Sequence, residues 1–251
     1  MSDEIDWDFF ASEAIKSLDE LTADVDLELA YKNTNYIQKR LPYDIEQESI
    51  NLMNRGWFIW FADGTISDFS RHARALVGKD APKQDLYLSN YIKENISDFE
   101  SVLTRLHPNR KDQIVDAFKC HSLKLYYASV PVFLILAEGI GRDFYPEVGI
   151  YAKHSPKDSK KGLPLTIDIL DSVSSLKIFE EAILKPLGVS GSLTKSIHNP
   201  TDTQKELFNR HLIVHGHSNM YGSEENSLKA ISLVFYMHKS LSLLKNKIPH
   251  D

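Results

Sequence analysis

The sequence predicts an all-α protein, a helical bundle with an N-terminal helical extension. In most segments the apolar residues recur at the spacing of one face of an α-helix. No segment sustains the alternation of apolar and polar residues that a half-buried strand requires. Glycines and prolines lie at the ends of the helical patterns. We expect residues 105–251 to form the bundle and residues 1–104 to form a helical region packed on it.

The first half contains segments of helical pattern and one dense aromatic block. The expected helices are Ile5–Leu21, Asp44–Phe61 with Pro42 just before it, Asp68–Val77 ended by Gly78, and the weaker Leu86–Leu103. The aromatic block, Trp57 to Phe61, closes the second of them. Since its four aromatic side chains cannot share one helix face, we expect core packing there rather than a platform for stacking nucleobases.

The pattern sharpens after Pro108. A single stripe at helical spacing is formed by Ile114, Phe118, His121 and Leu125. Pro131 then starts a very apolar segment, Val132–Ile140, which Gly139 and Gly141 break. We expect this segment to be a buried central helix. Cys120 falls on the preceding helix, where a small core residue is a better expectation than a nucleophile.

The remaining helices are bounded by recognisable end signals. They are Ser172–Leu187, closed by Pro186 and Gly188, then Glu206–His215, terminated by Gly216, and a last helix that Ser223 caps. Glu224 and Glu225 lie in the first turn of that last helix, where the macrodipole favours negative charge. Loops are expected over Tyr151–Pro164 and Gly188–Pro200.

Composition narrows the class of protein. The 251 residues include 29 Lys and Arg against 35 Asp and Glu, a net charge of −6, which argues against a general nucleic-acid coating protein. The single cysteine excludes an intrachain disulfide framework and a cysteine-based zinc finger. The acidic N-terminus lacks the basic region of a signal peptide, and Val130–Ala137 is too short to span a bilayer. We expect a cytoplasmic protein with no membrane association.

The residues Phe208 to His217 carry the chemistry that the sequence offers. Arg210 and His215 are separated by four residues, and His211 and His217 lie beside them. RNA can be cleaved without a metal because its 2′-OH attacks the adjacent phosphorus, provided that a base, an acid and a cation assist. Histidine transfers protons near neutral pH, and arginine stays charged and fits phosphate oxygens. Arg210 and His215 are therefore predicted to be the catalytic residues.

Helix geometry raises a question about how Arg210 and His215 meet, and it also allows a metal-binding alternative. Five positions correspond to about 140° of rotation, so Arg210 and His215 do not share a face of an ideal helix. His211 and His215 do share one and, with His217 and Glu225, could bind zinc. The HExxH form is absent because Leu212 occupies the glutamate position. We expect neither a metal nor another cofactor.

The motif resembles the RxxxxH signature of the HEPN superfamily of helical ribonucleases. Those proteins usually carry Asn or Asp after the arginine, where this chain has His211. The resemblance covers roughly residues 105 to 245, including Glu138-Gly139 at the end of an apolar helix and the run Tyr221–Ala230. It implies an RNA substrate, a homodimer that brings two motifs to one cleft, and a toxin or phage-defence role. An antitoxin or regulatory protein is the partner that such a role implies.

Several residues near the motif have both a functional and a structural interpretation. Glu138 either orients Arg210 or a motif histidine, or forms a cap or salt bridge elsewhere. Tyr221 either holds a base or phosphate or caps the turn, whereas a structural role is favoured for Asn209 and a supporting hydrogen bond for Asn226. The basic loop either steers RNA or is merely solvated, and its lysines are Lys153, Lys157, Lys160 and Lys161.

The sequence therefore predicts a metal-independent endoribonuclease. His215 is the expected general base and acid, Arg210 the phosphate-binding cation, and His211 a positioning residue. The alternative is a non-catalytic module of the same fold that binds a nucleotide, an RNA or a protein partner. In that alternative, Arg210 and His215 are a hydrogen-bonded pair that holds two helices together, or Arg210 alone binds phosphate.

Overall fold

The structure is a computed structural model, and it describes residues 36–60, 71–73 and 75–248. These residues form helices joined by loops, and no strand beyond an isolated bridge between Lys153 and Pro164 occurs among them. The all-α prediction is confirmed. The predicted helix Ile5–Leu21 lies outside the described residues, and Asp68–Val77 lies partly outside them.

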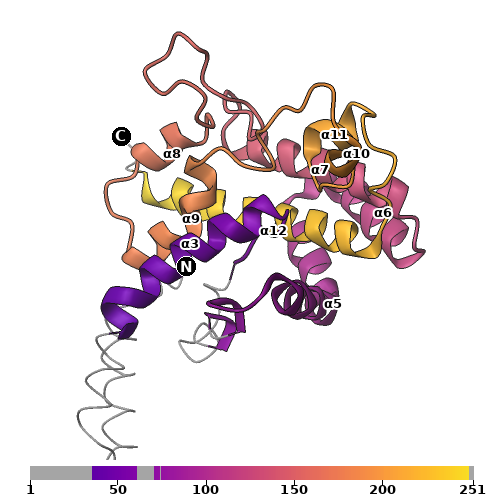
Figure 1. Cartoon of the computed structure of the whole chain (residues 1–251), viewed down its shortest axis with the longest axis horizontal. Helices are drawn as coiled ribbons and strands as arrows, with labels where there is room; N and C mark the ends of the chain where they lie inside the picture. The colour runs from indigo at the N-terminus through magenta and orange to yellow at the C-terminus, as the bar shows by residue number, and fades with distance from the viewer. Residues whose placement is uncertain (1–35, 61–70, 74, 249–251) are drawn as a thin grey trace, which may run out of the picture.

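The helical elements are arranged around one long helix, α12 (Figure 1). They are the π-helical turn η1 (Tyr36–Arg40), α3 (Leu41–Asn54), α5 (Ala81–Leu106), the 3-10 turn η2 (Pro108–Arg110), α6 (Lys111–Ser122), α7 (Tyr126–Phe144), α8 (Ile167–Asp171), α9 (Ile178–Gly188), α10 (Asp202–Lys205), α11 (Arg210–Val214) and α12 (Glu224–Lys247). None of the described helices is long and apolar enough to span a membrane.

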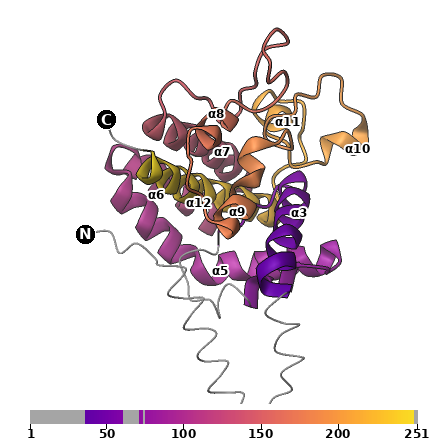
Figure 2. The same ribbon diagram turned by 90° about the vertical axis from the view of Figure 1, so that its left-hand side faces the viewer.

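Helix α12 is the centre of the core. Ser223 caps it as predicted, since its hydroxyl oxygen accepts a hydrogen bond from the Asn226 amide at 3.1 Å. Most of its length is buried, and α7 and α5 pack against it (Figure 2). A single cluster of buried hydrophobic side chains extends from Leu41 in α3 to Leu244 in α12. Residues before position 105 therefore share this core with residues after it.

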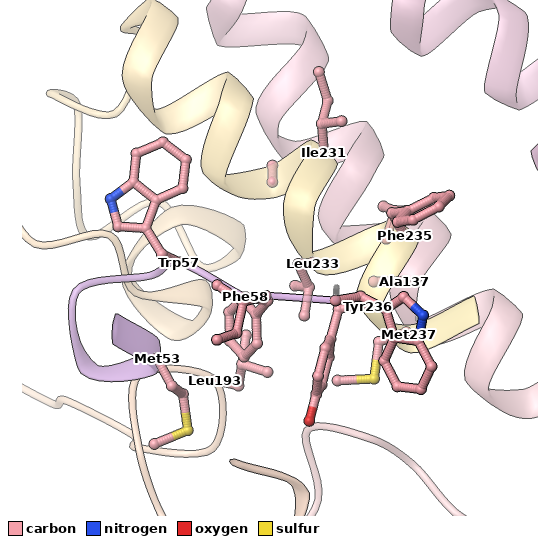
Figure 3. Close-up of a cluster of buried hydrophobic side chains, with 14 of the residues drawn as sticks. Met53, Trp57, Phe58, Ala137, Leu193, Ile231, Leu233, Phe235, Tyr236 and Met237 are labelled. Atoms are coloured by element: carbon pink, nitrogen blue, oxygen red, sulfur yellow. The ribbon is translucent and has the colours of Figure 1, made fainter. Parts of the chain in front are cut away.

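The helix predicted over Asp44–Phe61 ends earlier, at Asn54. Gly56 adopts φ +92°, which favours glycine, and a Cβ there would lie 2.4 Å from a ring carbon of Phe208. The next residues, Trp57 to Trp60, are not helical and are buried, so the expectation of core packing is confirmed for them. Figure 3 shows Phe58 beside Tyr236 of α12, and the two ring centres are 5.5 Å apart. The amide of Phe58 donates to the Ser232 hydroxyl of α12 at 3.2 Å.

Helix α7 differs from the predicted central helix at both ends. It begins at Tyr126, so Pro131 lies inside it, and it continues through Gly139 and Gly141 to Phe144. The two glycines allow close packing rather than breaking the helix. A Cβ at Gly139 would lie 2.4 Å from the Arg110 guanidinium, and one at Gly141 would lie 2.5 Å from the Ile150 side chain.

Other helix ends also shift relative to the sequence pattern. Helix α6 ends at Ser122, so Leu125 lies beyond it and is 53% exposed. The predicted helix Ser172–Leu187 begins only at Ile178, and Glu206–His215 shortens to α11. In α11 the shortening has a clear cause, because the Asn209 side chain caps the helix and fixes its start.

Candidate functional site

The motif is built on α11, whose start and end are both fixed. The side-chain oxygen of Asn209 accepts a hydrogen bond from the Leu212 amide at 3.1 Å. Its side-chain nitrogen donates to the carbonyls of Ser192 at 2.8 Å and Lys195 at 3.1 Å. At the other end, His215 is the C-cap and Gly216 adopts φ +71°. Asn209 is thus a buried structural residue that ties α11 to the segment 189–201.

Arg210 lies over an aromatic ring, and no counter-ion for it is found among the described residues. Its guanidinium carbon is 4.8 Å from the centre of the Tyr151 ring. The Tyr151 hydroxyl donates to the Leu134 carbonyl of α7 at 2.7 Å, which fixes the ring. The Nε of Arg210 is buried without a hydrogen bond, and no carboxylate in the described part of the chain forms an ion pair with this side chain.

Four histidine rings gather beside Arg210, with His211 in the middle. The ring centres of His211 and His215 are 4.7 Å apart, so the predicted shared face is present. The ring of His217 stacks on His211 at 5.5 Å with an interplanar angle of 14°. His198, from the segment 189–201, meets His211 edge to face at 4.9 Å and 83°. The motif histidines and Arg210 therefore form one basic cluster.

His211 is the most constrained member of this histidine cluster. Its Nδ1 atom is buried without a hydrogen bond. Burial, and then the neighbouring His215, His198, His217 and Arg210, lower the pKa of His211. This histidine is therefore neutral at neutral pH.

The residues named for the metal-binding alternative can be located in the described part of the chain. No group of three or more His, Cys, Asp or Glu side chains in the described ranges is arranged to hold a metal ion. Glu225, which the sequence offered as a further ligand, instead forms an ion pair with Lys229 at 2.6 Å. The rings of His215 and His217 each contact the ring of His211.

Glu138 lies near the site but does not contact the motif directly. Arg142 Nε donates to its Oε1 atom at 3.1 Å, while its Oε2 atom is buried without a hydrogen bond. Burial, chiefly, and the Glu138 carboxylate raise the pKa of Tyr151, whereas Arg210 lowers it. The charges of Glu138 and Arg210 therefore both act on Tyr151, and the carboxylate forms its ion pair with Arg142.

Tyr221 and Asn226 hold the loop after the motif against α7. Pro131 has no amide N–H for the carbonyl of Tyr127, four residues earlier, and the Tyr221 hydroxyl donates to that carbonyl at 3.4 Å. The Asn226 side-chain nitrogen donates to the Tyr221 carbonyl at 3.1 Å, and the Tyr127 hydroxyl donates to the Asn219 carbonyl at 3.0 Å. These contacts join the loop after the motif to α7 and α12, and a supporting role of Asn226 in the site stays a prediction.

The basic loop between α7 and α8 is only partly available to a ligand. Lys160 Nζ lies 2.6 Å from carboxylate oxygens of both Asp168 and Asp171, so its charge is compensated. Within the described residues no ion pair involves the side chains of Lys153, Lys157 or Lys161. The loop projects from the body of the molecule (Figure 1).

Two contributors to the site were not predicted from the sequence. Tyr151 lies 59 positions before Arg210, and His198 lies 13 positions before His211. Neither spacing corresponds to a helical repeat or a known ligand pattern. A signal existed only for their segments, since both residues lie in or next to the predicted loops.

No family model, no curated protein and no solved structure matches this chain. The motif and the geometry around Arg210 are therefore the features that point to a function.

Proposed function

We propose that this protein is a metal-independent endoribonuclease whose catalytic residues are Arg210 and His215. One observation carries the proposal, namely that Arg210 lies beside a cluster of histidines with no counter-ion in the described ranges of the chain. A buried or half-buried guanidinium ordinarily pairs with a carboxylate, because desolvating its charge is costly. Among the described residues the Arg210 guanidinium faces the Tyr151 ring and forms no ion pair, so its charge is free to bind a phosphate oxygen.

The proposed reaction is attack of a ribose 2′-OH on the adjacent phosphorus. His215 is exposed and takes the 2′ proton, while the Arg210 guanidinium holds the non-bridging oxygens and stabilises their developing charge. The 2′ oxygen bonds to phosphorus, and the bond to the 5′ oxygen breaks. The products are a 2′,3′-cyclic phosphate and a 5′-hydroxyl end.

The neighbours of this pair support the same reaction. Neutral His211 has its ring against that of His215, and the ring of His217 stacks on that of His211. Among the described residues no carboxylate forms an ion pair with Arg210 or with these histidines, so the charge of Arg210 can attract an anion. The resemblance to HEPN ribonucleases extends the proposal to a homodimer acting as a toxin or phage-defence effector.

The test is cleavage of RNA in excess EDTA by wild-type protein and by the variants R210A and H215A. We expect wild type alone to cleave and to leave 2′,3′-cyclic phosphate ends, with each variant at least about 100-fold slower. Arg105→Ala, an exposed arginine of α5, is a matched control that should retain activity.

The binding-module alternative predicts a different result. No protein in the set would then cleave RNA, while R210A alone would lose affinity for a 2′-O-methyl oligonucleotide and H215A would retain it. Cleavage that persists in both R210A and H215A would contradict the assignment of the site.

A further inference from the structure

His198 lies outside the Arg210–His217 motif and yet contacts it. Its side chain is exposed, and its ring meets the ring of His211 at 4.9 Å, edge to face. His215 contacts the same central ring at 4.7 Å from a different part of the chain. His198 and His215, two exposed imidazoles from different segments, therefore both contact the ring of His211 beside Arg210.

The position of His198 is determined by buried contacts of its segment. Asn209, at the start of α11, donates from its side-chain nitrogen to the carbonyls of Ser192 and Lys195. Ile197, directly before His198, is 9% exposed and so is anchored in the interior. The segment that carries His198 is therefore attached to the same helix that carries Arg210.

The proposed reaction needs two proton transfers at opposite ends of the reacting phosphate. In an in-line displacement the attacking 2′ oxygen and the leaving 5′ oxygen lie on opposite sides of phosphorus. An imidazole placed beside one oxygen does not reach the other in the same step. A second proton-transfer group is therefore needed, unless water protonates the leaving group.

We propose that His198 is a second catalytic residue, the general acid that protonates the leaving 5′ oxygen; this inference rests on the proposed ribonuclease function. As His215 removes the 2′ proton, the 2′ oxygen bonds to phosphorus. The bond from phosphorus to the 5′ oxygen breaks, its electron pair goes to that oxygen, and protonated His198 supplies the proton. Exchange with water then returns both histidines to their starting protonation states.

In this arrangement His211 is an uncharged ring that contacts both His198 and His215. Because burial and the surrounding cationic groups lower its pKa, it remains neutral between the other two rings. A neutral ring adds no positive charge to its neighbours. His198 and His215 each contact this uncharged ring, so neither gains a cationic neighbour from it.

The test compares two substrates that differ in one atom. One is an RNA dinucleotide, and the other carries sulfur in place of the bridging 5′ oxygen, a leaving group that departs without a proton. We expect H198A to cleave the oxygen substrate at least about 100-fold more slowly than wild type. On the sulfur substrate H198A should regain most of the wild-type rate, whereas H215A should stay slow on both.

A matched control and the contrary outcomes complete the test. Ser196→Ala, an exposed position in the same segment, should cleave both substrates as wild type does. Wild-type rates in H198A, or an equal loss on both substrates, would overturn the general-acid role and leave the ribonuclease proposal standing. Failure of wild type to cleave either substrate would instead overturn the proposed function, and the role of His198 with it.

Discussion

At the scale of single residues, Arg210 depends on an aromatic face where a carboxylate would be usual. A carboxylate would neutralise the guanidinium and compete with a phosphate for its donors, whereas the Tyr151 ring stabilises the charge and leaves the donors unused. The Tyr151 hydroxyl is committed to the Leu134 carbonyl, so the ring cannot turn away. The pair is thus preorganised to bind an anion.

This arrangement predicts the effects of two substitutions of Tyr151. Tyr151→Leu removes the ring face and should weaken binding of a 2′-O-methyl oligonucleotide by about two- to thirtyfold, the range that a cation–π contact supplies. Tyr151→Phe keeps the face and should bind as wild type does. It should also lower the free energy of unfolding by about 1 kcal/mol, because one hydrogen bond is lost. Equal binding losses in both variants would contradict the role of the ring.

The residues of the site differ in how far the sequence could predict them. A structural role was predicted for Asn209, but its place as the N-cap was not, because the predicted helix Glu206–His215 put it inside the helix. The contact of His211 with His215 followed from their spacing. Tyr151 and His198 were not predictable, because their contacts arise from the way loops return to α11, which no local pattern encodes.

At the scale of elements, α11 is too short to be stable by itself. A helix of 5 residues makes few internal hydrogen bonds, so tertiary contacts must hold it. Asn209 supplies most of these contacts at its start, because it caps α11 and satisfies two carbonyls of the segment 189–201. The geometry of the whole site therefore depends on one buried amide.

Asn209→Ala should accordingly destabilise the protein more than the loss of an N-cap alone would. The cap and two hydrogen bonds together correspond to a decrease of about 2–3 kcal/mol in the free energy of unfolding. Ser223→Ala is the comparison, since Ser223 only caps α12 and should cost about 1 kcal/mol. Urea unfolding measures the free energy of unfolding of both variants. If Asn209→Ala lowers it no more than Ser223→Ala does, the hydrogen bonds from Asn209 to the Ser192 and Lys195 carbonyls contribute nothing to stability.

The ends of the elements show where sequence patterns fail. The long apolar run after Ser223 has an unambiguous cap, and α12 begins where expected. The run from Asp44 to Phe61 is equally apolar, yet its last part crosses the core as extended chain because Gly56 turns the backbone and Phe208 packs on it. Periodicity registers apolar burial, and it does not distinguish a helix from a short buried segment.

At the scale of the whole molecule, the core around α12 contains buried histidines. His107 and His238 are both buried, with Nε2 of the first 2.9 Å from Nδ1 of the second. His121 Nδ1 lies 2.8 Å from the Ser227 hydroxyl of α12, which also contacts Ser129 of α7 at 2.8 Å. Burial lowers the pKa of both His107 and His121.

The stability of the fold should therefore decrease on acidification. In the unfolded chain His107 and His121 bind protons below about pH 6.5, while in the folded protein these two residues do so only at lower pH. Their contribution is thus present above pH 6.5 and is lost as the pH falls through the lowered pKa values, by at most about 1.4 kcal/mol per pH unit for each histidine.

Urea unfolding at pH 8, 7, 6 and 5 measures this loss, and His121→Gln should reduce its slope. The amide of glutamine does not titrate, so the variant binds no proton at this position in either state. At pH 8 the difference from wild type reports only the packing change, and the two stability curves should converge as the pH falls. Parallel curves from pH 8 to pH 5 would mean that protonation of His121 does not contribute, and that the acid sensitivity of the core arises at other groups.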